Sequence, residues 1–289
     1  MKRRSQPLAE TARTLGLEPA EARRRLAAAR EKLRVARATR IPPHTDHKVI
    51  TSWNGLMISA FARAAVVLND PAYVTTATRA MQAVLDTLSD GDRLRRHAVG
   101  SRATGDGFLD DYAFLIAALL DCWEATFDAQ WLDRAIAFQR TLDEHFRDEE
   151  HGGYFSTAAW HQQLLGREKP DYDGAEPSGN SVALENLLRL HALTTDDAYR
   201  ARAEALLTAF ASNLAQRPSA LPRMLSGLDF HLDRAKEIVI VTPSSRAEAA
   251  PFRARLRGVF LPHHVLAVVP VGRAQASLGD RLPLVSDKI

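Results

Sequence analysis

The chain has 289 residues, of which 46% are hydrophobic and 25% charged, and its net charge is +3. This composition is typical of a folded globular protein and excludes disorder as the main state. No run of about 18 uncharged apolar residues occurs, and no apolar segment follows the charged N-terminus, so we expect neither a membrane span nor a secretory signal. The single cysteine, Cys122, cannot form a disulfide framework, and we expect a buried thiol in a cytoplasmic protein.

Residues 1–40 form a basic segment that predicts one solvent-exposed helical element. They carry twelve Lys or Arg and four Glu, a net charge of +8, which leaves −5 on residues 41–289. Such a segment invites a nucleic-acid interpretation, but its narrow apolar stripe of Leu26, Ala27 and Leu33 contains no aromatic ring that could stack on a base. We therefore expect a solvated helix face and no nucleic-acid partner.

Residues 41–234 predict repeated helical hairpins. From residue 53 onward, apolar residues recur at steps of three and four, the period of a helix with one buried face. The second helix of each of three pairs opens with an Asp-x-x-aromatic element, at Asp70, Asp128 and Asp196, where the aspartate suits the N-cap. Hairpins that repeat in this way stack into a solenoid or close into an (α/α) toroid.

The connectors of these predicted hairpins differ in length. Those within a hairpin span a few residues, whereas those between hairpins, near 89–108 and 148–176, are long, polar and contain glycine. Because long loops at one end of a helical scaffold commonly carry function, we expect a site on that face.

Residues 235–289 predict a small βαβ unit. Residues 238–241 and 265–269 are short runs of β-branched and aliphatic residues, and residues 246–257 between them have a helical pattern. The first strand lacks the Gly-rich turn of a dinucleotide site, so we expect no cofactor there.

Three polar stretches, residues 46–55, 107–112 and 167–181, precede the first helices of the hairpins. In them, Asp111 together with Asp173 or Glu176 could form an acid/base pair of the kind that glycoside chemistry uses. The alternative is that these acids cap helices and pair with neighbouring basic residues. Adjacent acids on a helix point about 100° apart, so we expect only one of Asp110 and Asp111 to face the interior.

Aromatic side chains near the same connectors offer stacking surfaces for a sugar. Trp53 and Asn54 lie at the start of one predicted helix, and Tyr154 follows the glycine turn at residues 152–153. The alternative is that these aromatic side chains only pack within the loops. No spacing of His, Cys and acidic residues predicts a metal site.

Three runs that overlap the polar stretches, residues 48–58, 109–115 and 173–181, together resemble a known family. It is the thioredoxin-domain-containing family related to the spermatogenesis-associated thioredoxin-like protein. The resemblance implies a six-hairpin toroid similar to N-acylglucosamine 2-epimerases and glycosidases, preceded in the family by a thioredoxin-like domain. This chain has no Cys-x-x-Cys, so no redox role is carried over, and it looks like a C-terminal part of such a protein.

The resulting hypothesis is an incomplete (α/α) toroid, mainly helical, that processes a small-molecule carbohydrate as an isomerase or hydrolase. A non-catalytic scaffold that binds a glycan or a partner is the alternative. We further expect no cofactor, no metal and no membrane partner, and the missing N-terminal thioredoxin-like and hairpin portion as a potential partner. The expected domains are 1–40, 41–234 and 235–289. The expected site residues are, for catalysis, Asp111, Glu176 and Asp173 and, for substrate binding, Trp53, Asn54, Asp110, Tyr112, Tyr154 and Asn180.

Overall fold

The structure is a computed structural model that describes residues 6–161, 166–233, 235–286 and 288. It divides into two compact units, Met1–His47 and Lys48–Ile289. In the described part of the first unit, α1 (Leu8–Thr14) and α2 (Pro19–Ala38) form a hairpin whose buried apolar side chains are Ala12 and Ala22. The arginines of α2 lie exposed, as expected for a solvated helix face.

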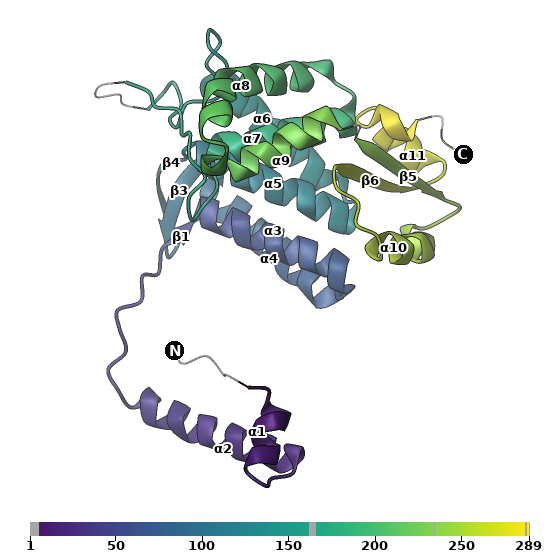
Figure 1. Ribbon diagram of the computed structural model, residues 1–289. Coiled ribbons are helices and arrows are strands. Elements are labelled where there is room, and N and C mark those ends of the chain that lie inside the picture. Colours follow the sequence, from purple (N-terminus) through teal and green to yellow (C-terminus); the bar gives the residue numbers. More distant parts are fainter. Residues whose placement is uncertain (1–5, 162–165, 234, 287, 289) are drawn as a thin grey trace. The chain divides into compact units, whose positions relative to one another are not determined.

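Three helical hairpins form the body of the second unit (Figure 1). Among the described residues, no helix is both long and apolar enough to cross a bilayer. The hairpins are α3 (Thr51–Leu68) with α4 (Pro71–Leu88), α5 (Leu109–Thr126) with α6 (Ala129–His145), and α7 (Gly179–Thr194) with α8 (Asp197–Gln216).

The sequence repeat corresponds to one turn that occurs three times. The first helix of each hairpin ends at a non-glycine residue with a left-handed backbone, and the three φ values lie between 54° and 58°. The next residue is the repeated aspartate, whose carboxylate accepts a hydrogen bond from the backbone N–H two positions later. The prediction that Asp70, Asp128 and Asp196 cap the second helices is therefore confirmed.

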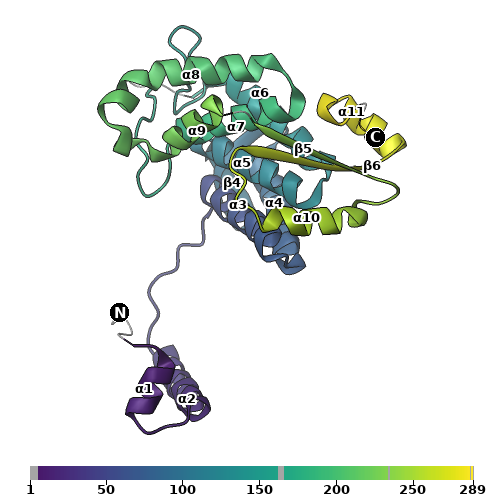
Figure 2. The same ribbon diagram turned by 45° about the vertical axis from the view of Figure 1, so that its right-hand side comes forward.

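The hairpins form two layers, which both views of the ribbon support (Figures 1 and 2). The helices α3, α5 and α7 pack side by side, and α9 (Pro222–Leu232) packs on α7. The helices α4, α6 and α8 each pack on the partner of their own hairpin from the outside. Fourteen of the eighteen residues of α5 are buried, so this helix forms the centre of the core. This arrangement is the predicted mainly helical, incomplete (α/α) toroid.

A glycine permits the close approach of α3 and α5. A Cβ atom placed on Gly55 would lie 2.8 Å from the backbone carbonyl carbon of Phe114 and 2.9 Å from its oxygen. No side chain fits at that distance, so the two helices pack backbone to backbone at this point.

A small antiparallel sheet occupies the first long connector, which the sequence analysis treated as a loop. The strand β3 (Arg93–Val99) pairs with β1 (Val49–Ile50), β2 (Ser89–Asp90) and β4 (Arg102–Asp106). Gly91 and Gly100 take left-handed φ values of 60° at the two hairpin turns. The long connector near 89–108 therefore contains three short strands that the sequence analysis did not predict.

The predicted βαβ unit is present. The strands β5 (Lys236–Thr242) and β6 (His264–Pro270) pair in parallel, and α10 (Ala250–Arg257) lies between them in sequence. Figure 2 shows the two strands side by side, with α10 and α11 (Arg273–Gly279) near them. The strand β6 is buried and contacts α5 and α7, so the unit packs onto the helical layers.

Candidate functional site

The candidate site lies where α3, α5 and α7 begin. These three helices present their N-termini at one end of the inner layer, and β1, β3 and β4 lie beside that end (Figure 1). Helix N-termini carry unpaired backbone N–H groups and partial positive charge, which favours carboxylates there. The polar stretches predicted from the sequence therefore reach a common face.

Asp111 is a buried structural residue. Its Oδ1 accepts hydrogen bonds of 2.9 Å from the backbone N–H of Ser52 and from the Arg96 guanidinium, and its Oδ2 accepts one of 2.9 Å from the N–H of Phe108. Burial raises the pKa of Asp111, and the charge of Arg96 opposes this rise. With both oxygens engaged and no exposed surface, Asp111 joins the first turns of α3 and α5. These contacts favour the alternative in which Asp111 caps a helix and pairs with a basic residue.

Asp110, the preceding acid, has the environment of a reactive carboxyl group. Burial raises the pKa of Asp110 to about 6, and the negative charges of Asp111 and Glu176 add to this rise. Arg96 and the backbone N–H of Gly179 act in the opposite direction. The side chain lies close against the start of α7, since a Cβ on Gly179 would lie 2.6 Å from its Oδ1. Asp110 is thus the member of the acidic pair that faces Glu176 and α7.

Glu176 and Trp53 converge at this face. The indole Nε1 of Trp53 donates a hydrogen bond of 2.7 Å to Oε1 of Glu176, and the Trp53 ring is 55% exposed. The bond fixes the direction of an exposed aromatic ring. Asn54 lies beside Trp53, but its side-chain amide donates to the backbone oxygen of Ile50. The Asn54 side chain therefore stabilises the first turn of α3.

Asp173 caps a helix instead of joining the acid pair. Its Oδ1 accepts a hydrogen bond of 2.7 Å from the N–H of Ser178, and its Oδ2 accepts one of 2.8 Å from the N–H of Arg223 at the start of α9. Because both oxygens hold backbone N–H groups, the structure favours the capping alternative for this residue.

Three further expected substrate-binding residues are buried. The Tyr112 hydroxyl accepts a hydrogen bond from the N–H of Leu94, and its ring packs on the aromatic core. The Tyr154 hydroxyl donates to Asp143 over 2.6 Å, and Asn180 binds both the N–H and the C=O of Tyr154 through its amide. None of these side chains is more than 1% exposed. In the structure Tyr112, Tyr154 and Asn180 therefore make internal contacts, and their expected contact with a substrate stays a prediction.

Arg96 is a site residue that the sequence analysis missed. It lies on β3, binds Asp111, and places its guanidinium 5.4 Å from the centroid of the Phe108 ring. It is the cation whose charge opposes the raised pKa values of Asp110 and Asp111. The Asp-Gly and Gly-Ser pairs at residues 90–91 and 100–101 are hairpin signals that would have predicted β3 and its position.

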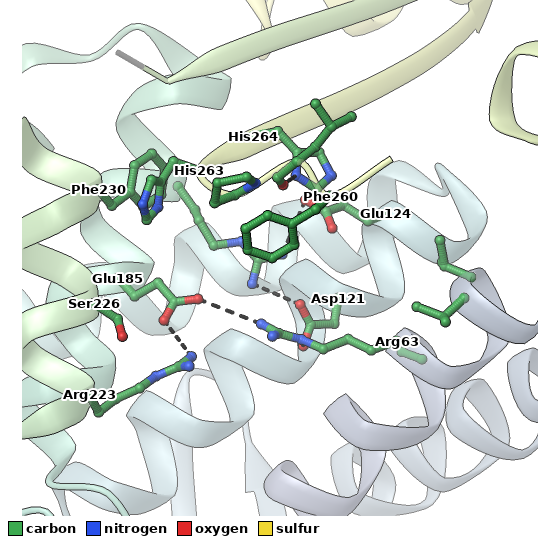
Figure 3. Close-up of a pocket in the computed structure, with 16 residues that line it drawn as sticks. Arg63, Asp121, Glu124, Glu185, Arg223, Ser226, Phe230, Phe260, His263 and His264 are labelled. Atoms are coloured by element: carbon green, nitrogen blue, oxygen red, sulfur yellow. Dashed lines mark hydrogen bonds and ion pairs between the residues drawn. The ribbon is translucent and has the colours of Figure 1, made fainter. Parts of the chain in front are cut away.

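A charged cavity of about 490 Å³, also missed, lies along the inner helices. Figure 3 shows the side chains of Arg63, Asp121, Glu185 and Arg223 directed toward one another in it. Arg63 Nε lies 2.8 Å from Asp121 Oδ2, and Arg223 pairs with Glu185. Burial would raise the pKa of Asp121, but the charges of Arg189 and Arg63 hold it below its usual value. Charged residues within otherwise apolar helical stripes were the sequence signal for this network.

No family model matches the chain. Curated relatives include spermatogenesis-associated protein 20 of Homo sapiens, 35% identical over 287 residues, and that of Rattus norvegicus, 37% identical over 283 residues. These matches cover 96% and 94% of this chain but 36% of each relative, so the chain spans about a third of their length. An uncharacterized protein of Caenorhabditis elegans is 32% identical over 250 residues, which are 84% of this chain and 34% of that protein.

Solved structures that match part of this chain include a cellobiose 2-epimerase and an α-mannanase. Cellobiose 2-epimerase from Bacillus thermoamylovorans matches with a TM-score of 0.49 and 20% identity, over 58% of this chain and 45% of that one. A glycoside hydrolase family 76 α-mannanase from Bacteroides thetaiotaomicron matches with a TM-score of 0.47 and 16% identity, over 61% and 46%.

Proposed function

We propose that this chain, a homologue of part of spermatogenesis-associated protein 20, carries a carbohydrate-processing site of the isomerase or hydrolase type. In this proposal Asp110 and Glu176 are the acid/base pair, and Trp53 is the surface on which a sugar ring stacks. The observation that carries it is the position of Asp110, whose pKa is raised to about 6, beside a carboxylate that is bonded to an exposed indole.

The chemistry follows from the different environments of the two acids. A carboxyl group with a pKa of about 6 can give up and take back a proton near neutral pH, as general acid/base catalysis requires. In hydrolysis, protonated Asp110 would donate its proton to the leaving oxygen while the Glu176 carboxylate takes a proton from water. In isomerisation, one carboxylate would remove the proton next to a carbonyl carbon and the other would return a proton to the product.

An exposed indole suits a sugar because its flat apolar face matches the C–H face of a pyranose ring. The hydrogen bond to Glu176 restricts rotation of the Trp53 ring, which reduces the entropy lost when a ligand stacks on it. Tyr172, which is 65% exposed on the connector that leads to α7, offers a second ring.

The same ring favours a second candidate function, a glycan-binding scaffold without turnover. One oxygen of Glu176 is already engaged by Trp53, so this carboxylate can orient a ligand without transferring a proton. The two functions share the binding surface and differ in the role of Asp110.

The test is incubation with a panel of mono- and disaccharides in D₂O, followed by NMR. Epimerised sugar that carries deuterium on the carbon next to its carbonyl group supports an isomerase. Cleaved sugar supports a hydrolase. The variants Asp110→Asn and Glu176→Gln should abolish turnover. The control is Asp106→Asn, which removes an acid on β4 that pairs with Arg95 on β3. This variant should retain turnover. Binding without turnover by the wild-type chain would favour the scaffold, and absence of both would contradict a carbohydrate site.

A further inference from the structure

The cavity in Figure 3 has more hydrogen-bond donors than its own acceptors use. Arg63, Arg189 and Arg223 contribute three guanidinium groups, each with five N–H donors. Oδ2 of Asp121 accepts hydrogen bonds from Arg63 and Ser59, whereas its Oδ1 forms an ion pair with Arg189. The side chains of Arg63 and Arg223 are 49% and 34% exposed, so a ligand can reach them.

Arg189, which is buried, is only partly satisfied by the acids around it. The side chain is 6% exposed, and it lines the cavity. Its Nη1 forms an ion pair with Asp121 Oδ1 at 2.8 Å, and its Nη2 forms one with Glu124 Oε1 at 3.4 Å. The contact of Nη1 lies outside hydrogen-bond geometry, so among the described residues this buried nitrogen makes an ion pair but no hydrogen bond. A ligand oxygen in line with this N–H group would supply the hydrogen bond that Asp121 does not make.

Glu185 occupies the position between the two exposed arginines. One of its oxygens pairs with Arg223, and the other lies 3.6 Å from Nη2 of Arg63, beyond hydrogen-bond distance. Glu185 therefore satisfies these arginines only in part, and a second oxyanion could share them. Arginine binds carboxylates and phosphates through paired, parallel N–H groups, which makes such anions the matching ligands.

The far wall of the cavity adds a surface for the organic part of a ligand. Phe260, which is 90% exposed, lines it from the segment that leads into β6, and His264 lines it as the first residue of that strand. His263 on the same segment has a left-handed φ of 55°, stacks on Phe230 and lies 2.7 Å from Asp229. A non-glycine residue in this conformation is held there by its surroundings, which positions the wall.

From these observations we propose that the cavity between α3, α5, α7 and α9 binds a small organic anion through Arg63, Arg189 and Arg223. The ligand carries a carboxylate or a phosphate group, and its remaining atoms lie against Phe260 and His264. This site is separate from the surface formed by Trp53, Asp110 and Glu176, none of which lines the cavity.

The proposal is tested by calorimetric titration of the full chain at constant ionic strength with inorganic phosphate, glucuronate and glucose. We expect saturable binding of phosphate or glucuronate, and no binding of glucose at the same concentrations. Binding of phosphate alone identifies a phosphorylated ligand, whereas binding of glucuronate identifies a carboxylate. Binding of glucose as strongly as of the anions, or no anion binding at all, would overturn the proposal.

Variants separate a binding role from a structural one. Arg63→Gln and Arg223→Gln should each weaken anion binding at least tenfold, whereas Arg200→Gln, on an exposed pair of α8, should leave it unchanged. Glu185→Gln should strengthen binding several-fold, because it removes a negative charge that competes for the same arginines. A purely structural network predicts the opposite, weaker or unchanged binding in Glu185→Gln. Thermal melting of each variant confirms that it is folded before titration.

Discussion

The indole nitrogen of Trp53 and the carboxylate of Glu176 are joined by a 2.7 Å hydrogen bond, although the residues are 123 positions apart. The bond links the first turn of α3 to the connector that leads into α7. It brings two of the three polar stretches together, and Asp110 brings the third to the same place. The proposed site therefore depends on how three inner helices begin.

The first prediction separates the ring of Trp53 from its N–H group. Trp53→Phe keeps a stacking surface and loses the bond to Glu176, so carbohydrate affinity should fall by about three- to tenfold. Trp53→Ala loses both and should cost more than about tenfold, since a stacked aromatic ring contributes on the order of 1 kcal/mol beyond its buried area. Titration with the saccharide that binds the wild-type chain measures both values. Equal affinity in all three proteins would remove Trp53 from the site.

The second prediction concerns the stability effect of the Asp110 charge. The folded pKa of about 6 lies above the ordinary value of 3.8, so the folded state binds more protons than the unfolded state between these values. Stability should therefore fall as the pH rises from about 4 to about 6. Asp110→Asn lacks this penalty and should be more stable than the wild type at pH 8 by about 1 kcal/mol, after allowance for partial solvent screening.

Urea denaturation at pH 4.5 and pH 8 measures this difference. The gain in Asp110→Asn should shrink at the lower pH, where the wild-type carboxyl is largely protonated. A gain that is the same at both pH values would come from another source, and a loss of stability at pH 8 would contradict the assignment.

The third prediction is that the neighbouring acid behaves in the opposite way. Asp111→Ala removes the acceptor of two backbone N–H groups and of the Arg96 guanidinium at a site without solvent. Breaking such a buried, charged hydrogen-bond set should lower the free energy of unfolding by about 3–5 kcal/mol. The comparison of Asp111→Ala with Asp110→Asn in the same urea experiment distinguishes the structural acid from the reactive one. Similar effects of the two changes would contradict the division of roles.

The fourth prediction tests the contact between α3 and α5. Gly55→Ala places a Cβ 2.8 Å from the backbone of Phe114, so the helices must separate, at a cost of about 1–3 kcal/mol. Gly258→Ala is the control, because its nearest contact at 3.5 Å is ordinary and its φ of −83° suits alanine. Thermal melting should show a lower Tm for the first variant and little change for the second. A Gly55→Ala protein as stable as the wild type would show that the helices are not so close.

Local sequence signals were sufficient for much of the fold. The three-and-four periodicity and the repeated aspartate N-caps predicted the hairpins, and the two aliphatic runs near the C-terminus predicted the parallel strands. The strand β3 was not predicted because its core-facing residues, Leu94 and Ala98, are separated by arginines and a histidine that hide the alternation. Its glycine turns carried the clearer signal.

The sequence predicts the location of the proposed site but not the environment of each of its residues. That Trp53, Glu176 and the acidic pair lie near connectors follows from the sequence, but which of Asp110 and Asp111 is reactive does not. The two differ by about 100° around α5, and the packing of α3 and α7 against that helix decides their environments. The burial of Tyr112 and Tyr154 could not be predicted either, because an aromatic side chain fits a core as well as a surface.

The most direct test of the proposed site is the NMR titration of the Asp110 carboxyl carbon, assigned by its absence in Asp110→Asn. We predict an apparent pKa of about 6 in the wild-type chain, and a lower pKa in Glu176→Gln, because the Glu176 charge is one of the causes of the rise. A wild-type pKa near the ordinary value of 3.8, unchanged by the loss of Glu176, would show that the two carboxyl groups do not interact and would contradict the acid/base pair.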